Sequence, residues 1–124
     1  MASISNVKLS ATKDAPSNSW RVAVSYKAYF SAFELANFNY RDGFVLWESD
    51  WPDPDDKITG VVGVSQFNPT VSPTTRTMTY TLRPSDVDKI DEFLGEELYA
   101  VIRLRNIDLN LLVEKKSPTL NINL

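Results

Sequence analysis

The sequence predicts an all-β fold: an antiparallel sandwich of about seven to nine strands, with one short helix near residues 85–94. Apolar and polar residues alternate along three stretches, residues 20–26, 77–82 and 120–124. Successive side chains of a strand point to opposite faces, so this alternation gives each strand one buried and one solvated surface. Histidine and cysteine are both absent, which leaves few side chains for catalysis. We therefore expect a β-sandwich with little chemistry of its own.

Composition narrows the class of protein further. The 124 residues fit a single domain spanning 1–124, and 43% hydrophobic residues suffice for its core. The formal net charge of −3 disfavours nucleic acid as a partner. Residues 1–8 lack the basic head and apolar run of an export signal, and no apolar stretch is long enough for a membrane span. The missing cysteines suit a reducing compartment but are also common in exported bacterial proteins, so the compartment stays open, with the cytoplasm slightly favoured.

The first half of the chain divides into strands and turns. A short strand at Val7–Leu9 precedes a polar loop at 12–19. The next strand is the clearest, because alternate residues from Trp20 to Phe30 are apolar. Residues 33–40 and 44–49 then predict a hairpin that turns at 41–43, where Asp-Gly suits a tight turn. The spacing of Phe30 and Phe33 also matches a short helix, which leaves the start of this hairpin open.

The second half continues the pattern. Residues 51–56 hold two prolines and predict an exposed loop, and 58–67 hold two glycines, which suggests a bulged or edge strand. A central strand is expected at 76–82. Ser85 is placed to cap the helix, which would end at Gly95. Two further stretches, 98–105 and 109–124, complete the strands, the latter with a break at Ser117-Pro118.

Residues 74–105 resemble part of a known architecture. A threonine-rich strand, a capped turn and the run 97–104 look like the E strand, E–F connection and F strand of immunoglobulin-like and fibronectin type III-like sandwiches. Tyr99 takes the place of the tyrosine corner in this resemblance. Its implied role is structural, with the hydroxyl bonded to upstream backbone near the helix.

An acidic loop is the candidate metal site. Asp50, Asp53, Asp55 and Asp56, with Glu48 nearby, supply the oxygen ligands that calcium prefers. The loop lacks the glycine and distal glutamate of an EF-hand. A stiff, solvated turn is therefore the favoured interpretation, and we expect no cofactor, with calcium as the alternative.

Aromatic rings form a second candidate site. Trp47 and Trp51, with Tyr29 and Tyr40, could build a platform on which a sugar stacks or a protein partner docks. The alternative is that these rings fill the core or its rim, with Trp51 the most exposed. Arg103 and Arg105 point to one face of their strand, where pairing with a neighbouring strand is the favoured interpretation.

Catalysis has the weakest support. Carboxylates alone remain as acid–base groups, and Asp86, Asp88, Asp91 and Glu92 are expected on the surface of the helix. We therefore expect a non-catalytic module that acts through protein–protein contacts or self-association. The edge strands 58–67 and 119–124 offer one means of pairing with another chain. The alternative function is a carbohydrate- or calcium-binding module built on Trp47, Trp51 and loop 48–56.

Overall fold

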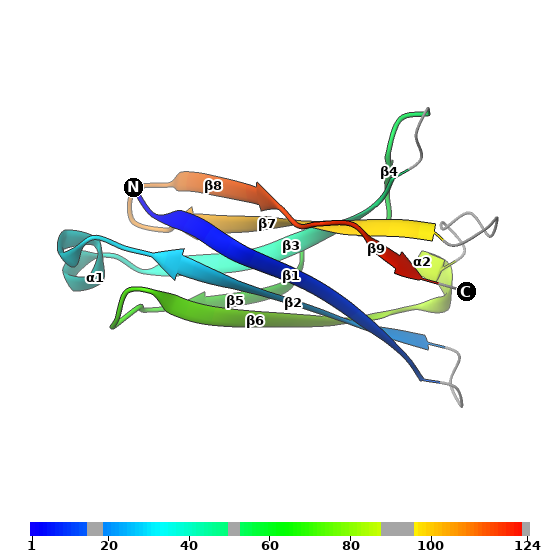
Figure 1. The fold of residues 1–124 in the computed structure, drawn as a ribbon. Coiled ribbons are helices and arrows are strands. Elements are labelled where there is room, and N and C mark those ends of the chain that lie inside the picture. Colours follow the sequence, from blue (N-terminus) through cyan, green and yellow to red (C-terminus); the bar gives the residue numbers. More distant parts are fainter. Residues whose placement is uncertain (15–18, 50–52, 88–95, 123–124) are drawn as a thin grey trace.

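The computed structural model describes residues 1–14, 19–49, 53–87 and 96–122, and it confirms the all-β sandwich (Figure 1). Two antiparallel sheets pack face to face. The smaller sheet has the order β1-β2-β6, formed by β1 (Ser3–Asp14), β2 (Ser19–Tyr29) and β6 (Thr74–Leu82). The larger sheet holds β3 (Tyr40–Ser49), β4 (Asp56–Lys57), β5 (Val62–Phe67), β7 (Glu96–Asn106), β8 (Leu111–Lys116) and β9 (Leu120–Ile122). None of the described helices is long and apolar enough to cross a membrane.

Strands β3 and β7 form the centre of the larger sheet. All of β3 pairs with β7, from Tyr40↔Asn106 to Ser49↔Glu97. Short strands occupy the two remaining edges: β5 and β4 follow one another along β3, while β8 and β9 follow one another along β7. The predicted chain break at Ser117-Pro118 separates β8 from β9.

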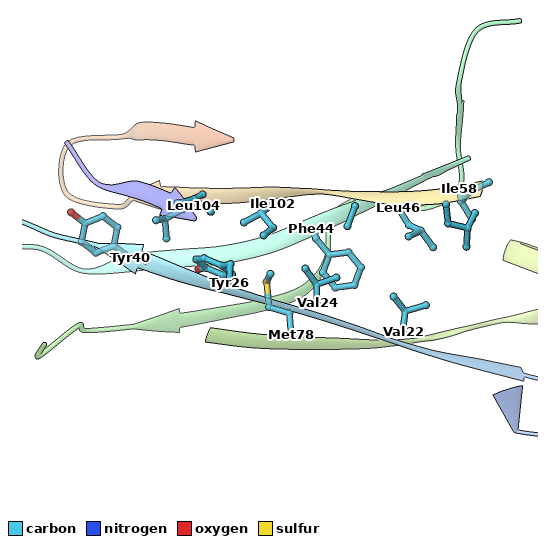
Figure 2. Close-up of a cluster of buried hydrophobic side chains, with 14 of the residues drawn as sticks. Val22, Val24, Tyr26, Tyr40, Phe44, Leu46, Ile58, Met78, Ile102 and Leu104 are labelled. Atoms are coloured by element: carbon cyan, nitrogen blue, oxygen red, sulfur yellow. The ribbon is translucent and has the colours of Figure 1, made fainter. Parts of the chain in front are cut away.

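The core lies between the sheets and follows the predicted alternation. Every second residue of β2 from Trp20 is buried, and so is every second residue of β7 from Leu98 to Leu104. Figure 2 shows side chains of β2 and β6 meeting those of β3 and β7, with Phe44 and Met78 near the middle. The strand at 76–82 also has its predicted inward face, but it lies at an edge of the smaller sheet and β2 is the central strand.

The hairpin predicted around residues 41–43 is wrong. These residues lie inside β3, and the chain before them forms the helix α1 (Ala32–Asn37). The Ser31 hydroxyl accepts from the Glu34 amide, and the Glu34 carboxylate accepts from the Ser31 amide, which is a capping box. The long ladder with β7 outweighs the local turn preference of Asp42-Gly43.

Strand β5 confirms the predicted irregular edge. It pairs with β3 alone among the described strands, and its register shifts between Asp42 and Phe44. Gly63 takes a φ of +64°, a conformation that favours glycine. The first predicted loop is shorter than expected, because β1 continues to Asp14. Residues 15–18 lie outside the described part of the chain.

The second helix begins one residue earlier than predicted. Helix α2 (Pro84–Val87) starts with proline, and the Asp86 carboxylate accepts from the Arg83 amide at 3.0 Å. Asp86 therefore satisfies a backbone donor at this helix start, the role expected of Ser85. The remainder of the predicted helix, 88–94, lies outside the described residues.

Candidate ligand-binding face

The candidate site is the solvent side of the larger sheet, which we call the outer face. It consists of the side chains of β3, β7 and β8 that point away from the core, together with Lys57 of β4. Its members are Arg41, Val45, Trp47, Glu97, Tyr99, Val101, Arg103, Arg105, Leu112, Glu114, Lys116 and Lys57. Basic residues outnumber acidic ones on this face, although the whole chain has a net charge of −3.

One end of the outer face carries an aromatic pair. Trp47 and Tyr99 are direct cross-strand neighbours, and their rings are stacked with centroids 6.5 Å apart and planes 4° from parallel. The ammonium of Lys116 lies 4.0 Å from the centre of the Tyr99 ring, a cation–π contact. Lys57 pairs with Trp47 on the other side. Trp47 stays half-buried, so part of its ring is available to a ligand.

Tyr99 is held in place by the acidic loop. Its hydroxyl donates to the Asp55 carboxylate. Burial raises the pKa of Tyr99, and the hydrogen bond and negative charge of Asp55 raise it further, to about 12. The tyrosine is therefore neutral at physiological pH. The tyrosine corner predicted here is wrong about the acceptor: the hydroxyl binds a carboxylate rather than backbone near the helix.

Beside the aromatic pair lies a shallow hollow of about 300 Å³. Trp47, Lys57 and Lys116 line it at one end and Arg103 at the other. Arg103 also makes an exposed ion pair with Glu114 of β8 at 3.5 Å, which confirms the predicted cross-strand pairing. Exposed pairs of this kind contribute little to stability and exchange readily with a ligand.

The other end of the outer face places two arginines against each other. Arg41 of β3 lies directly opposite Arg105 of β7. Like charges in this position destabilise a sheet. Arg105 donates to the side-chain oxygen of Asn110 at 2.6 Å, whereas the guanidinium of Arg41 has no hydrogen bond or ion pair within the described residues. The site therefore holds positive charge that the described part of the chain does not neutralise.

Exposed apolar side chains surround this arginine pair. Val61 and Val64 lean over Gly43, and with Leu112 and the arginines they border a second hollow of about 60 Å³. Val61 and Val64 are 47% and 53% exposed. Basic and apolar groups thus alternate along the outer face from Arg41 to Lys116.

The predicted calcium site does not assemble in the described residues. Asp53 and Asp56 are exposed, Asp55 binds Tyr99, and Glu48 is buried on the core side of β3. No group of three potential metal ligands occurs in the part of the chain that the structure describes. Asp50 lies outside that part, as does Trp51.

The prediction that Tyr29 and Tyr40 join Trp47 in an aromatic platform is wrong. Tyr40 is buried in the core, and its hydroxyl donates to Glu34 at 3.0 Å. Tyr29 is exposed, but it belongs to the smaller sheet. Trp47 instead pairs with Tyr99, which could be found only once the register of β3 and β7 was known.

The predicted exposure of Asp86 on the surface of the helix is also wrong. Asp86 is buried, and it accepts hydrogen bonds from the Tyr80 hydroxyl at 2.8 Å and the Arg83 guanidinium at 3.2 Å. Burial raises the pKa of Asp86, but the hydrogen bonds from Arg83 and Tyr80 outweigh this and lower it. Asp88, Asp91 and Glu92 lie outside the described residues.

Comparison with known proteins assigns no family. No family model and no curated protein matches the chain. Two solved structures share its outline: a structural genomics target, SoR45, and a Bordetella pertussis protein that carries the provisional name ApaA. SoR45 is 10% identical with a TM-score of 0.44, over 98% of this chain and 85% of its own. The Bordetella protein is 10% identical with a TM-score of 0.46, over 99% of this chain and 93% of its own.

Proposed function

We propose that this chain is a non-catalytic binding module that uses its outer face to contact a protein partner with an acidic surface. The observation that carries the proposal is the opposition of Arg41 and Arg105 across β3 and β7. A folded chain that keeps two like charges opposite each other gives up some stability. Local conflicts of this kind are concentrated at functional sites. A partner carboxylate between the two guanidinium groups would relieve the repulsion.

The residue composition of the outer face favours a protein over a small anion as the binding partner. Tryptophan, tyrosine and arginine are the residue types that dominate binding energy at protein interfaces. Here Trp47 and Arg103 line one hollow, to which Tyr99, only 6% exposed, also contributes, and exposed valines lie beside the arginine pair. An acidic segment with apolar residues would match both features, with its carboxylates on the arginines and its apolar side chains on Val61 and Val64.

The same charge argues against the outer face as a symmetric dimer interface. In a two-fold dimer the same patch meets itself, so this face, on which basic residues outnumber acidic ones, would meet a second face with the same excess of positive charge. A different protein with an acidic surface is therefore the better partner for this face.

Strand order supports an immunoglobulin-like or fibronectin type III-like scaffold for the module. In that architecture strands A, B and E belong to one sheet and C, F and G to the other. Strands β1, β2 and β6 share one sheet here, and β3, β7 and β8 share the other. We assign the chain to this architecture as part of the proposal.

The test is direct binding of a labelled probe peptide in which glutamate alternates with valine, measured by fluorescence anisotropy. We expect binding that weakens steeply with salt, and at least tenfold weaker binding by the double variant Arg41→Thr/Arg105→Thr. The control Arg21→Thr removes one exposed charge from the smaller sheet and should bind normally. Equal binding by both variants contradicts the proposal, and so does a preference for single-stranded DNA over the peptide.

A second candidate function is carbohydrate binding at Trp47. It is favoured by one observation, the half-buried tryptophan ring held flat by Tyr99. Sugars stack on such rings. A glycan panel followed by tryptophan fluorescence tests it: a response that Trp47→Phe reduces supports the candidate, and no response across the panel removes it.

A further inference from the structure

An apolar hollow that includes buried polar groups lies away from the outer face, where α1 meets the β7–β8 turn. It has a volume of about 260 Å³. Phe33, Leu109 and Leu111 form its rim, and they are 67%, 52% and 42% exposed. Leu104 and Tyr40 form its floor and belong to the core. Exposed apolar side chains that converge on a pocket commonly mark a ligand site.

A buried carboxylate lies in the wall of this pocket. Glu34 is 7% exposed, and its two oxygens accept from the Ser31 amide at 2.9 Å and the Tyr40 hydroxyl at 3.0 Å. The amide of Asn106 donates to the Tyr40 oxygen at 3.5 Å, which extends the chain of hydrogen bonds. Burial raises the pKa of Glu34, but the hydrogen bonds from Ser31 and Tyr40 outweigh it, so the pKa is lowered. Glu34 is therefore ionised at neutral pH.

Among the described residues no lysine or arginine lines the pocket, so none of their side-chain cations balances this charge there. The amino group of Met1 forms an ion pair with Glu34 Oε1 at 3.9 Å, but this distance is longer than a hydrogen bond and Met1 is mostly exposed, so solvent screens the pair and a ligand ammonium could replace it. Each carboxylate oxygen has two lone pairs and here accepts one described hydrogen bond. The pocket thus offers an anion with acceptor positions to spare, surrounded by hydrocarbon.

We infer that this pocket binds a small primary amine with an apolar body. The ammonium would donate to Glu34, and the hydrocarbon part would pack against Phe33, Leu109 and Leu111. The volume is slightly below the usual range for ligand sites, which limits the ligand to a few heavy atoms beyond the amine. The inference is independent of the outer face, because the two sites share no residue.

The test uses hexylamine as the probe and hexan-1-ol as its uncharged match. Titration of the full chain, followed by melting temperature and by amide chemical shifts, should show stabilisation by the amine. We expect binding of the alcohol to be at least tenfold weaker. An amine that leaves both readouts unchanged overturns the inference, as does equal binding of the two compounds.

Two variants locate the binding. Glu34→Gln keeps a side chain able to complete the capping box but removes the charge, and it should weaken amine binding at least tenfold without changing alcohol binding. Leu111→Ser lies on the rim, away from α1, and should weaken both. Val71→Ser changes an exposed apolar residue elsewhere and should change neither. Unchanged amine binding by Glu34→Gln contradicts the inference; if that variant fails to fold, unchanged binding by Leu111→Ser does so.

Discussion

The carboxylate of Asp42 binds the guanidinium of Arg76 through two hydrogen bonds, at 2.9 and 3.2 Å, in the interior between the two sheets. The Tyr26 hydroxyl donates to the same carboxylate at 2.6 Å. These three residues come from β3, β6 and β2, so the network joins the two sheets through polar contacts as well as apolar packing. The role of this network is structural, because the Asp42 side chain is fully buried.

Removal of Asp42 should therefore be costly. Asp42→Ala leaves Arg76 and Tyr26 without their shared acceptor, and breaking a buried ion pair typically costs about 3–5 kcal/mol. Urea denaturation should show a loss of this size. Arg21→Ala, an exposed charge on the same sheet as Arg76, should change the free energy of unfolding little. A loss no larger than that of the control would show that the network does not stabilise the fold.

Replacement by alanine should destabilise the chain at Gly43 and leave its stability nearly unchanged at Gly60. A Cβ at Gly43 would lie 2.8 Å from Val61 Cγ1 and 3.2 Å from the Val62 carbonyl oxygen, whereas nothing lies within 4 Å of one at Gly60. Gly43→Ala should thus cost about 1–3 kcal/mol through overpacking. Gly60→Ala should be nearly neutral. Equal melting temperatures for the two variants would contradict the close packing of β5 on β3.

Stability should fall in acid through Glu34 and Asp86. Hydrogen bonds lower the pKa of both carboxyls in the folded state despite burial. A lowered folded pKa contributes stability above the unfolded pKa that is lost as pH falls through the folded value. Unfolding free energy should therefore decrease below about pH 4. Asp86→Asn should make the free energy of unfolding depend less steeply on pH. An unchanged slope in that variant would show that Asp86 does not contribute to the loss of stability in acid.

Four tyrosines should ionise at a higher pH in the folded chain than in the unfolded chain. Burial, followed by hydrogen bonds to carboxylates, raises the pKa of Tyr26, Tyr40 and Tyr80, and raises that of Tyr99 to about 12. The stability they contribute is present below the unfolded value near 10 and is lost as pH rises through the folded values. Tyrosinate absorbance near pH 11 should be lower in the folded chain than in urea. Equal absorbance would contradict the buried hydrogen bonds.

The sequence predicted the strands whose periodicity is strong. Alternation from Trp20 to Phe30 and from Leu98 to Leu104 identified the two inward faces correctly, because strand period and burial coincide there. The turn predicted at Asp42-Gly43 was wrong for a physical reason. A buried aspartate inside a strand needs partners from other strands, and the local sequence does not reveal them.

The sequence allows a short helix at the position of α1 as one of two alternatives, and a local signal could have decided in its favour. Ser31 and Glu34 have the spacing of a capping box, which is a local signal. The arginine pair at Arg41 and Arg105 could not have been found from sequence, because their opposition depends on the register between two strands far apart in the chain. The outer face is therefore a property of the fold rather than of any motif.

The most direct test of the central claim measures stability and peptide binding together for Arg41→Thr. If the Arg41–Arg105 repulsion is retained for binding, this variant should unfold at higher urea concentration than the natural chain and bind the glutamate–valine peptide more weakly. Arg21→Thr should leave the binding unchanged. An Arg41→Thr chain that is no more stable and binds the peptide as well as the natural chain would contradict the account.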